Sequence, residues 1–88
     1  MTPLRLRLGK TIRRLREARG VSQEAFAQKA KVHRTTMSEI ERGLSNISVD
    51  IAERISIALD LALSDLFLEL EAGHAASTAR KARSRPNL

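Results

Sequence analysis

The chain has 88 residues, of which 16 are lysine or arginine and 10 are aspartate or glutamate, for a formal net charge of +6 at pH 7. It contains no cysteine, which excludes disulfides and thiolate metal sites and favours a cytoplasmic setting. No apolar run approaches the ~20 residues of a membrane-spanning helix, and the N-terminus lacks the apolar core of a signal peptide. We therefore expect one small domain with flanking tails and no membrane partner.

The charge is unevenly distributed along the chain. Residues 1–19 hold seven basic residues against Glu17 alone, and residues 74–88 hold four basic residues and no acid. Residues 20–73 hold five basic and nine acidic residues, a net of −4. Basic ends on an acidic body suit a polyanionic partner, such as a nucleic acid held by its backbone. The alternative is that the basic ends only aid solubility.

Apolar residues recur at helical spacing through most of the chain. Only Leu4, Leu6 and Leu8 alternate as in a strand, and these predict an extended arm or a ragged helix start near Pro3. The remaining periodicity predicts an all-α fold of five helices, at residues 6–19, 22–30, 33–42, 48–59 and 64–71.

Helix boundaries are indicated by residue types that favour them. Gly20 and Gly43 each follow an arginine, as expected just past a helix C-terminus. Ser22, Ser48 and Ser64 each precede a periodic apolar stretch, as N-cap residues do. The residues expected to face the core include Leu8, Ile12, Leu15, Ala25, Phe26, Ala30, Met37, Ile40, Val49 and Ala52.

The composition changes after Gly73. Residues 74–88 are rich in small and basic residues and have almost no bulky apolar side chain. Since such a segment cannot bury enough surface to offset the entropy of ordering, we expect a folded domain over residues 1–73 and a disordered basic tail over 74–88. Within that tail, Arg80–Arg85 are expected either to contact phosphates or to have no binding role.

Residues 22–43 carry the pattern with the clearest functional meaning. Two short helices are joined by a tight turn around residues 30–32, and Met37 and Ile40 point into the core. The second of these helices keeps a polar face free, made of Arg34, Thr35, Thr36, Ser38 and Glu39. A helix fits the DNA major groove, where arginine binds guanine, threonine contacts thymine and glutamate accepts from cytosine. An ordinary solvated helix face is equally compatible with this spacing.

Several sequence blocks follow one another over about residues 8–70: LGKTIRRLREARGVSQEAFAQKA, VHRTTMSEIERG, NISVDIAERISIALDL and SDLF. Their order and spacing strongly resemble the helix-turn-helix domain of lambda-type phage repressors and the related Xre-like regulators. The resemblance implies a five-helix, lambda-repressor-like domain with its helix-turn-helix at about residues 22–43. It also implies a sequence-specific regulator of transcription that binds double-stranded DNA.

By this resemblance, the base-reading residues are Arg34, Thr35 and Glu39, with Thr36 and Ser38 beside them. Thr36 stands where the family often has an aromatic residue. Glu39 is acidic in a groove lined by phosphates, so it needs a partner such as a cytosine, Arg34 or Arg42. We therefore expect base reading from Arg34 and Thr35 before Glu39.

Contacts to phosphates are expected at Gln23, His33, Arg42 and Asn46. Gln23 begins a helix, a position that favours anions, although capping of that helix is an alternative role. His33 is expected to start the next helix, as a cap or a phosphate contact. Arg16 and Glu41 match a salt-bridged pair, to which we assign a purely structural role. Asp60 replaces the glycine that the family usually has there, which predicts a tighter or differently shaped turn.

The last expected helix is more apolar than a lone surface helix needs to be. We expect Leu63, Leu66, Phe67 and Leu70 to form a homodimer interface, because paired half-sites raise the affinity of a small DNA-binding module. The alternative is that these residues only close the core of the single chain.

No pattern points to an enzyme, a cofactor or a metal. His33 and His74 are isolated, and no metal-ligand spacing, nucleophile elbow or phosphate-binding glycine loop is present. We expect a dimeric repressor or autoregulator that occupies a near-palindromic operator. An antitoxin that binds a partner toxin and its own promoter is the alternative, and an architectural DNA binder is a weaker one. A protein partner would be such a toxin or the transcription machinery.

Overall fold

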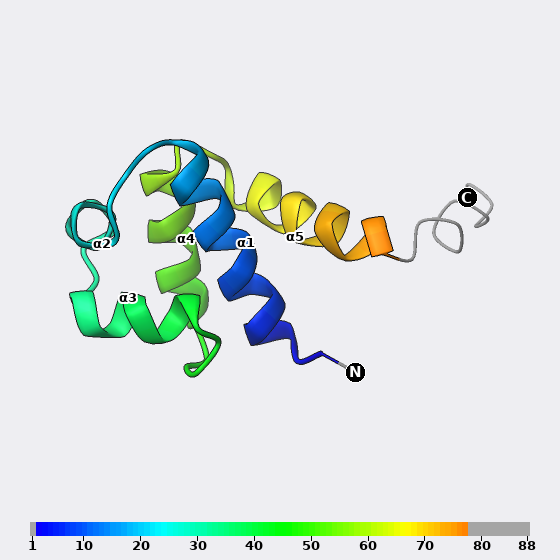
Figure 1. Cartoon of the computed structure of the whole chain (residues 1–88). Helices are drawn as coiled ribbons and strands as arrows, with labels where there is room; N and C mark the ends of the chain where they lie inside the picture. The colour runs from blue at the N-terminus through cyan, green and yellow to red at the C-terminus, as the bar shows by residue number, and fades with distance from the viewer. Residues whose placement is uncertain (1, 78–88) are drawn as a thin grey trace.

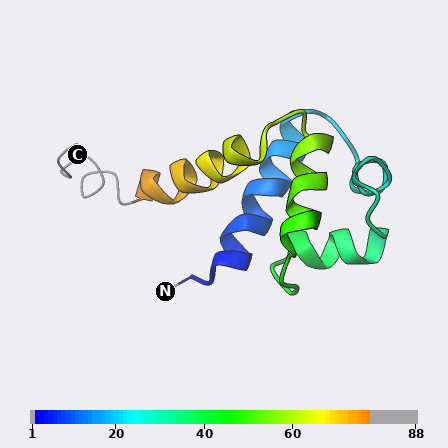
Figure 2. The ribbon, with the colours of Figure 1, turned by 180° about the vertical axis from the view of Figure 1, so that it is seen from behind.

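The computed structural model describes residues 2–77, and the side chains of residues 2–73. These residues form five α-helices and no strand: α1 (Leu4–Ala18), α2 (Gln23–Ala30), α3 (Arg34–Glu41), α4 (Val49–Ala58) and α5 (Leu63–Ser77). In both ribbon views α1 and α4 occupy the centre, with α2 and α3 to one side and α5 to the other (Figures 1 and 2). The expected all-α, five-helix fold is confirmed. None of the helices described is long and apolar enough to cross a membrane.

One apolar core joins all five helices. Helix α3 packs on α1 and α2, α2 also packs on α4, and α5 packs on α1 and α4. The buried apolar residues of this core are Leu8, Ile12, Leu15, Phe26, Ala27, Ala30, Met37, Ile40, Ile55, Ala58, Leu59, Leu66 and Leu70, and Ala52 is buried as well.

Two residues expected in the core are exposed instead. Ala25 of α2 faces solvent, because the buried positions of that short helix are Phe26, Ala27 and Ala30, which share one side at helical spacing. Val49, the first residue of α4, is 74% exposed, whereas Ile47 before it and Ile51 after it pack against the core. The prediction was wrong at both positions.

Serine side chains cap two of the helices as expected. The Ser22 hydroxyl accepts a hydrogen bond from the backbone N–H of Ala25 at 3.1 Å, and the Ser48 hydroxyl accepts from Ile51 at 3.1 Å. Ser64 is not an N-cap, because α5 already begins at residue 63. There the Asp65 carboxylate accepts from the backbone N–H of Ala62 at 3.3 Å.

This difference between the serines predicts different losses of stability. Ser48→Ala removes a cap and should lower the free energy of unfolding by about 1 kcal/mol. Ser64→Ala removes an exposed hydroxyl inside the first turn of α5, and should change it by less than about 0.5 kcal/mol. Urea unfolding followed by circular dichroism measures both. Equal losses in the two variants would contradict the assignment of the caps.

Four helices end in the same way, with two backbone hydrogen bonds that close a left-handed turn. After α4, for example, Asp60 N–H donates to the Ile57 carbonyl at 2.9 Å and Leu61 N–H donates to the Ser56 carbonyl at 2.8 Å. The left-handed residues are Gly20 (φ 68°), Lys31 (φ 59°), Gly43 (φ 75°) and Asp60 (φ 62°). Asp60 therefore takes the conformation that a glycine would take, and the expectation of a tighter or different turn was wrong.

The outer ends of α1 and α5 also differ from expectation. Helix α1 begins at residue 4, because the backbone N–H groups of Leu6 and Arg7 donate to the Pro3 carbonyl at 3.1 and 3.2 Å. An extended arm over Leu4–Leu8 was thus the wrong alternative. Helix α5 continues through Gly73 to residue 77, beyond the expected end near residue 71. The expected contacts of Arg80–Arg85, and residues 78–88 of the expected tail, lie outside the described residues.

Candidate nucleic-acid interface

The turn between α2 and α3 and the buried residues of α3 determine how α3 is oriented. Lys31 adopts a left-handed conformation, and the backbone N–H of Val32 donates to the Ala27 carbonyl at 2.9 Å. Val32 itself packs half-buried against the core, while Met37 and Ile40 of α3 are fully enclosed. The inner side of α3 is therefore held by hydrocarbon, and its polar side is left for contacts outside the chain.

Helix α3 is capped by a histidine. The Nδ1 atom of His33 accepts a hydrogen bond from the backbone N–H of Thr35 at 3.1 Å, and the ring is exposed. Because Nδ1 is an acceptor, the proton of the neutral ring lies on Nε2, which is free to donate. Capping, one of the two expected roles of His33, is therefore formed, and a phosphate contact through Nε2 remains compatible with it.

A surface hollow lies where the start of α2 meets α3. It has a volume of about 320 Å³ and is lined by Gln23, Arg34, Thr35 and Ser38. The fold thus brings one expected phosphate contact next to three of the expected base readers, across eleven residues or more of sequence. A guanidinium, an amide and hydroxyl groups line the hollow without any carboxylate, which suits an anionic or base-edge partner.

The carboxylate of Glu41 in α3 accepts hydrogen bonds from side chains of α1 and α2, next to this hollow. Arg16 of α1 contacts Glu41 of α3 twice, with Nε 2.8 Å from Oε2 and Nη2 3.0 Å from Oε1. Gln23 of α2 donates from Nε2 to Glu41 Oε1 at 3.1 Å. The side chains of Arg16 and Glu41 are only 10% and 2% exposed. The expected Arg16–Glu41 pair is present, and the third contact, from Gln23, was not predicted from the sequence.

This arrangement stabilises the charged form of Arg16 and orients the Gln23 side chain. The hydrogen bond to Glu41 raises the pKa of Arg16 above its ordinary value, against the opposing effect of burial. The third nitrogen of Arg16, Nη1, donates to the Val21 carbonyl at 2.8 Å. Since Ser22 caps α2, Gln23 has no capping role, and its contact with Glu41 holds its side chain at the edge of the hollow.

Glu39 is directed toward the loop that follows α3. The Ser45 hydroxyl donates to Glu39 Oε1 at 3.2 Å, whereas the expected protein partners were Arg34 and Arg42. Arg42 instead donates from Nε to the Ser38 carbonyl at 3.4 Å. Glu39 does not line the hollow, and neither does Thr36, which is half-buried. Asn46 is exposed in the same loop.

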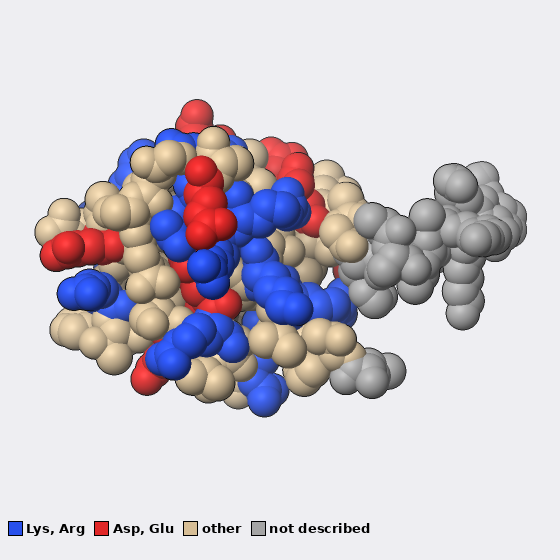
Figure 3. Space-filling model, in the orientation of Figure 1, with Lys and Arg blue, Asp and Glu red and all other residues tan. Residues whose placement is uncertain are grey.

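A cation beside α3 was missed in the sequence. Arg5, in the first turn of α1, donates from Nε to the Gly43 carbonyl at 3.1 Å. Leu6 lies against Gly43 as well, so closely that a Cβ on that glycine would meet Leu6 Cδ1 at 2.6 Å. A helix start at residue 4 would have placed Arg5 in the first turn of α1, but its contact with Gly43 depends on the packing of α1 against α3. Lys and Arg side chains cluster over the middle of the face shown in Figure 3, where α1 lies in Figure 1.

The residues expected at a dimer interface differ in their exposure. Leu66 and Leu70 are 0% and 2% exposed, because α5 packs them against α1 and α4 of the same chain. Leu63 is half-buried against the same core. Phe67 and Leu68 are 37% and 64% exposed. The assignment of Leu66 and Leu70 to an interface is therefore corrected. Among residues 63–73, the large apolar side chains that remain outward are those of Phe67 and Leu68.

Comparison with known proteins gives the same fold and the same kind of domain. A helix-turn-helix family model matches residues 12–66. Control protein C.MunI of a Mycoplasma species is 39% identical over 72 residues, 81% of this chain and 97% of that protein. The clp gene regulator ClgR of Corynebacterium glutamicum is similar in structure, with a TM-score of 0.80, 27% identity, and coverage of 96% of this chain and 89% of ClgR.

A second similar structure includes DNA. It is the restriction–modification controller protein C.Esp1396I, solved as a tetramer in complex with its natural 35-base-pair operator. The similarity has a TM-score of 0.76 and 28% identity, and covers 82% of this chain and 95% of that one. With the family model spanning most of the described helices and a relative matched over nearly its whole length, this chain belongs to the helix-turn-helix family of Xre-like and lambda-repressor-like regulators.

Proposed function

We propose that this chain is a sequence-specific regulator of transcription that binds its operator as a dimer, with α3 in the major groove. The observation that carries the proposal is the hollow at the junction of α2 and α3. It gathers Gln23, Arg34, Thr35 and Ser38, while Met37 and Ile40 hold the opposite side of α3 in the core. A helix held in this way presents side chains at its N-terminal end to base edges.

In this proposal Arg34 and Thr35 are the main base readers. Both are exposed in the first turn of α3, where arginine can bond guanine O6 and N7 with two hydrogen bonds. Ser38 lies beside them in the hollow, and the half-buried Thr36 and Glu39 are secondary. The phosphate contacts are Gln23, His33, Arg42 and Asn46, to which the structure adds Arg5 as a further candidate.

The regulatory role that we propose is that of a controller which represses or tunes its own operon in the cytoplasm. Two observations support it: the identity to a control protein over 97% of that protein's length, and the similarity to a controller bound to its operator. The exposed Phe67 and Leu68 on α5 would supply apolar surface for the dimer.

Selection of bound duplexes from a random pool tests this function. We expect enrichment of an inverted repeat whose half-sites are about 34 Å apart, one turn of B-DNA, because a two-fold dimer presents two copies of α3 at that spacing. Successive rounds of selection should use rising salt concentration, because salt weakens contacts to phosphates and leaves base-specific contacts to decide the enrichment. A pool that emerges without any common sequence would contradict a sequence-specific regulator, and a single unrepeated site would contradict the dimer.

A further inference from the structure

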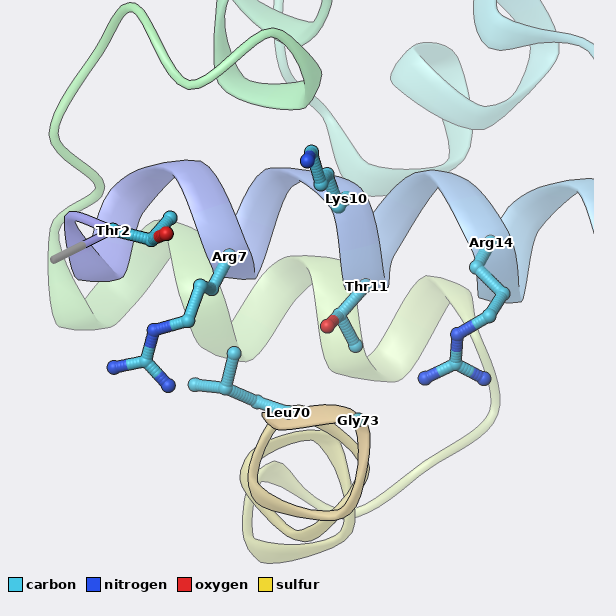
Figure 4. Close-up of a pocket in the computed structure, with 7 residues that line it drawn as sticks. All are labelled: Thr2, Arg7, Lys10, Thr11, Arg14, Leu70 and Gly73. Atoms are coloured by element: carbon cyan, nitrogen blue, oxygen red, sulfur yellow. The ribbon is translucent and has the colours of Figure 1, made fainter. Parts of the chain in front are cut away.

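A second cavity lies away from α3, between α1 and α5. It has a volume of about 360 Å³, within the range of about 300–1,000 Å³ that is usual for small-molecule sites. It is lined by Thr2, Arg7, Lys10, Thr11, Arg14, Leu70 and Gly73. Of these seven residues, three are cationic, two carry hydroxyl groups, and none carries a carboxylate. Figure 4 shows all seven. The lining is therefore suited to an anion.

One cation in this cavity lacks a hydrogen-bond partner. The Nε and Nη1 atoms of Arg7 are buried, and within the described part of the chain no acceptor reaches them. A buried charged N–H group without an acceptor is strongly destabilising, so native proteins almost always satisfy such groups. The missing acceptor is what a bound anion would supply.

The second cation lies on the other side of the same opening. Figure 4 shows Arg7 and Arg14 extending from α1 toward α5 on either side of Thr11, with Leu70 below them. Among the described side chains, Arg14 forms an ion pair with the exposed Glu69 carboxylate at 3.4 Å, and exposed pairs of this kind are weak. Arg14 can therefore turn toward a ligand at little expense.

Residues of α5 form the floor of the cavity and leave space for a ligand. Leu70 supplies an apolar surface, and Gly73 has no side chain to fill the space. A Cβ added at Gly73 would have Arg14 Nη2 as its nearest neighbour, at 3.9 Å. A group held here would touch both helices at once.

We propose that this cavity binds the phosphate group of a small anion, such as a free diphosphate or a mononucleotide, held between Arg7 and Arg14. Guanidinium groups bond phosphate oxygens through paired N–H groups, and the hydroxyls of Thr2 and Thr11 are further donors. No residue of α2 or α3 lines the cavity, so the site is separate from the surface assigned to base reading. The site does not depend on the function proposed above.

Isothermal titration of the full chain with pyrophosphate, in a phosphate-free buffer, tests the proposal. We expect saturable binding with one site per chain. Arg7→Gln should weaken it by about tenfold, since a charge-assisted hydrogen bond is lost. Gly73→Leu keeps every charge but fills the cavity, and should weaken binding as well. The matched control is Arg13→Gln, an exposed arginine of α1 that pairs with Glu17 and does not line the cavity.

The outcomes separate a small ligand from the DNA backbone. The same variants are titrated with the selected operator, and melting curves verify that each is folded. Pyrophosphate binding that is lost in Arg7→Gln and Gly73→Leu, with operator affinity kept within about twofold, supports the proposal. Absence of pyrophosphate binding, or equal binding by Arg7→Gln and the wild type, overturns it. Loss of operator affinity without pyrophosphate binding also overturns it and assigns Arg7 to a DNA phosphate.

Discussion

Replacement of Glu41 by glutamine is expected to lower the free energy of unfolding by about 3–5 kcal/mol, the usual loss when one partner of a buried ion pair is removed. The side chain of Arg16 is only 10% exposed, and it would lose the buried counter-charge that it contacts at 2.8 and 3.0 Å. The exposed Glu17 carboxylate, 3.9 Å from Arg16 Nη2, is a weaker partner. A small domain has about 5–15 kcal/mol of stability in all, so this variant should be close to unfolding at room temperature. Urea unfolding followed by circular dichroism measures the loss.

The control for this variant is an ion pair of the same type at the surface. Glu69→Gln removes the partner of Arg14, whose side chain and that of Glu69 are both exposed. Surface pairs contribute about 0–1 kcal/mol, so this change should be nearly neutral. If Glu41→Gln and Glu69→Gln lost similar amounts of stability, the buried carboxylate would not be what holds α1, α2 and α3 together.

Replacement of Gly9 by alanine is expected to destabilise the protein by about 1–3 kcal/mol, although alanine is the better helix former. Helix α1 crosses α3 at Gly9, where a Cβ would meet the backbone oxygens of Ile40 and Glu41 at 2.3 and 2.8 Å. Backbone atoms cannot rotate away as a side chain would, so the two helices must move apart. Thermal unfolding should show a lower midpoint.

The same substitution at Gly73 is expected to have the opposite sign. Gly73 is also helical, but a Cβ there would have its nearest neighbour at 3.9 Å. Gly73→Ala should therefore stabilise α5 by up to about 1 kcal/mol, through lower entropy of the unfolded chain. A stabilising effect at Gly9 would contradict the close crossing of α1 and α3.

The periodic apolar pattern was sufficient to predict much of this fold. Leu8, Ile12 and Leu15 recur at spacings of four and three, and all three are buried in α1. Met37 and Ile40 were sufficient to orient α3, since two inward residues at that spacing determine which polar residues lie outward. The face that carries Arg34 and Thr35 could therefore be predicted before any coordinates were known.

Contacts between distant segments could not be predicted in the same way. The hydrogen bond from Gln23 to Glu41 depends on how α2 and α3 cross, and no local sequence pattern encodes that crossing. The apolar character of Leu66 and Leu70 fits both a dimer interface and the core of a single chain. The packing of α5 on α1 and α4, which places them in the core, could not be derived from the sequence pattern.

Local backbone features were also missed where an unusual residue takes on a familiar role. Lys31 and Asp60 adopt the left-handed conformation that glycine favours, with φ of 59° and 62°. The two hydrogen bonds that close each turn compensate for the steric penalty of a side chain there. Helix α5 passes through Gly73 because alanines on both sides favour the helix, and a single glycine is not enough to end it.

The most direct test of the base-reading surface uses the variant that carries both Arg34→Ala and Thr35→Ala. Its affinity for the selected operator and for a scrambled duplex is compared with that of the wild type at one salt concentration, after melting curves show that it is folded. Each lost base contact removes about 1–3 kcal/mol of discrimination, so preference for the operator should fall at least tenfold. A folded variant that still preferred its operator as strongly as the wild type does would show that α3 does not read the sequence.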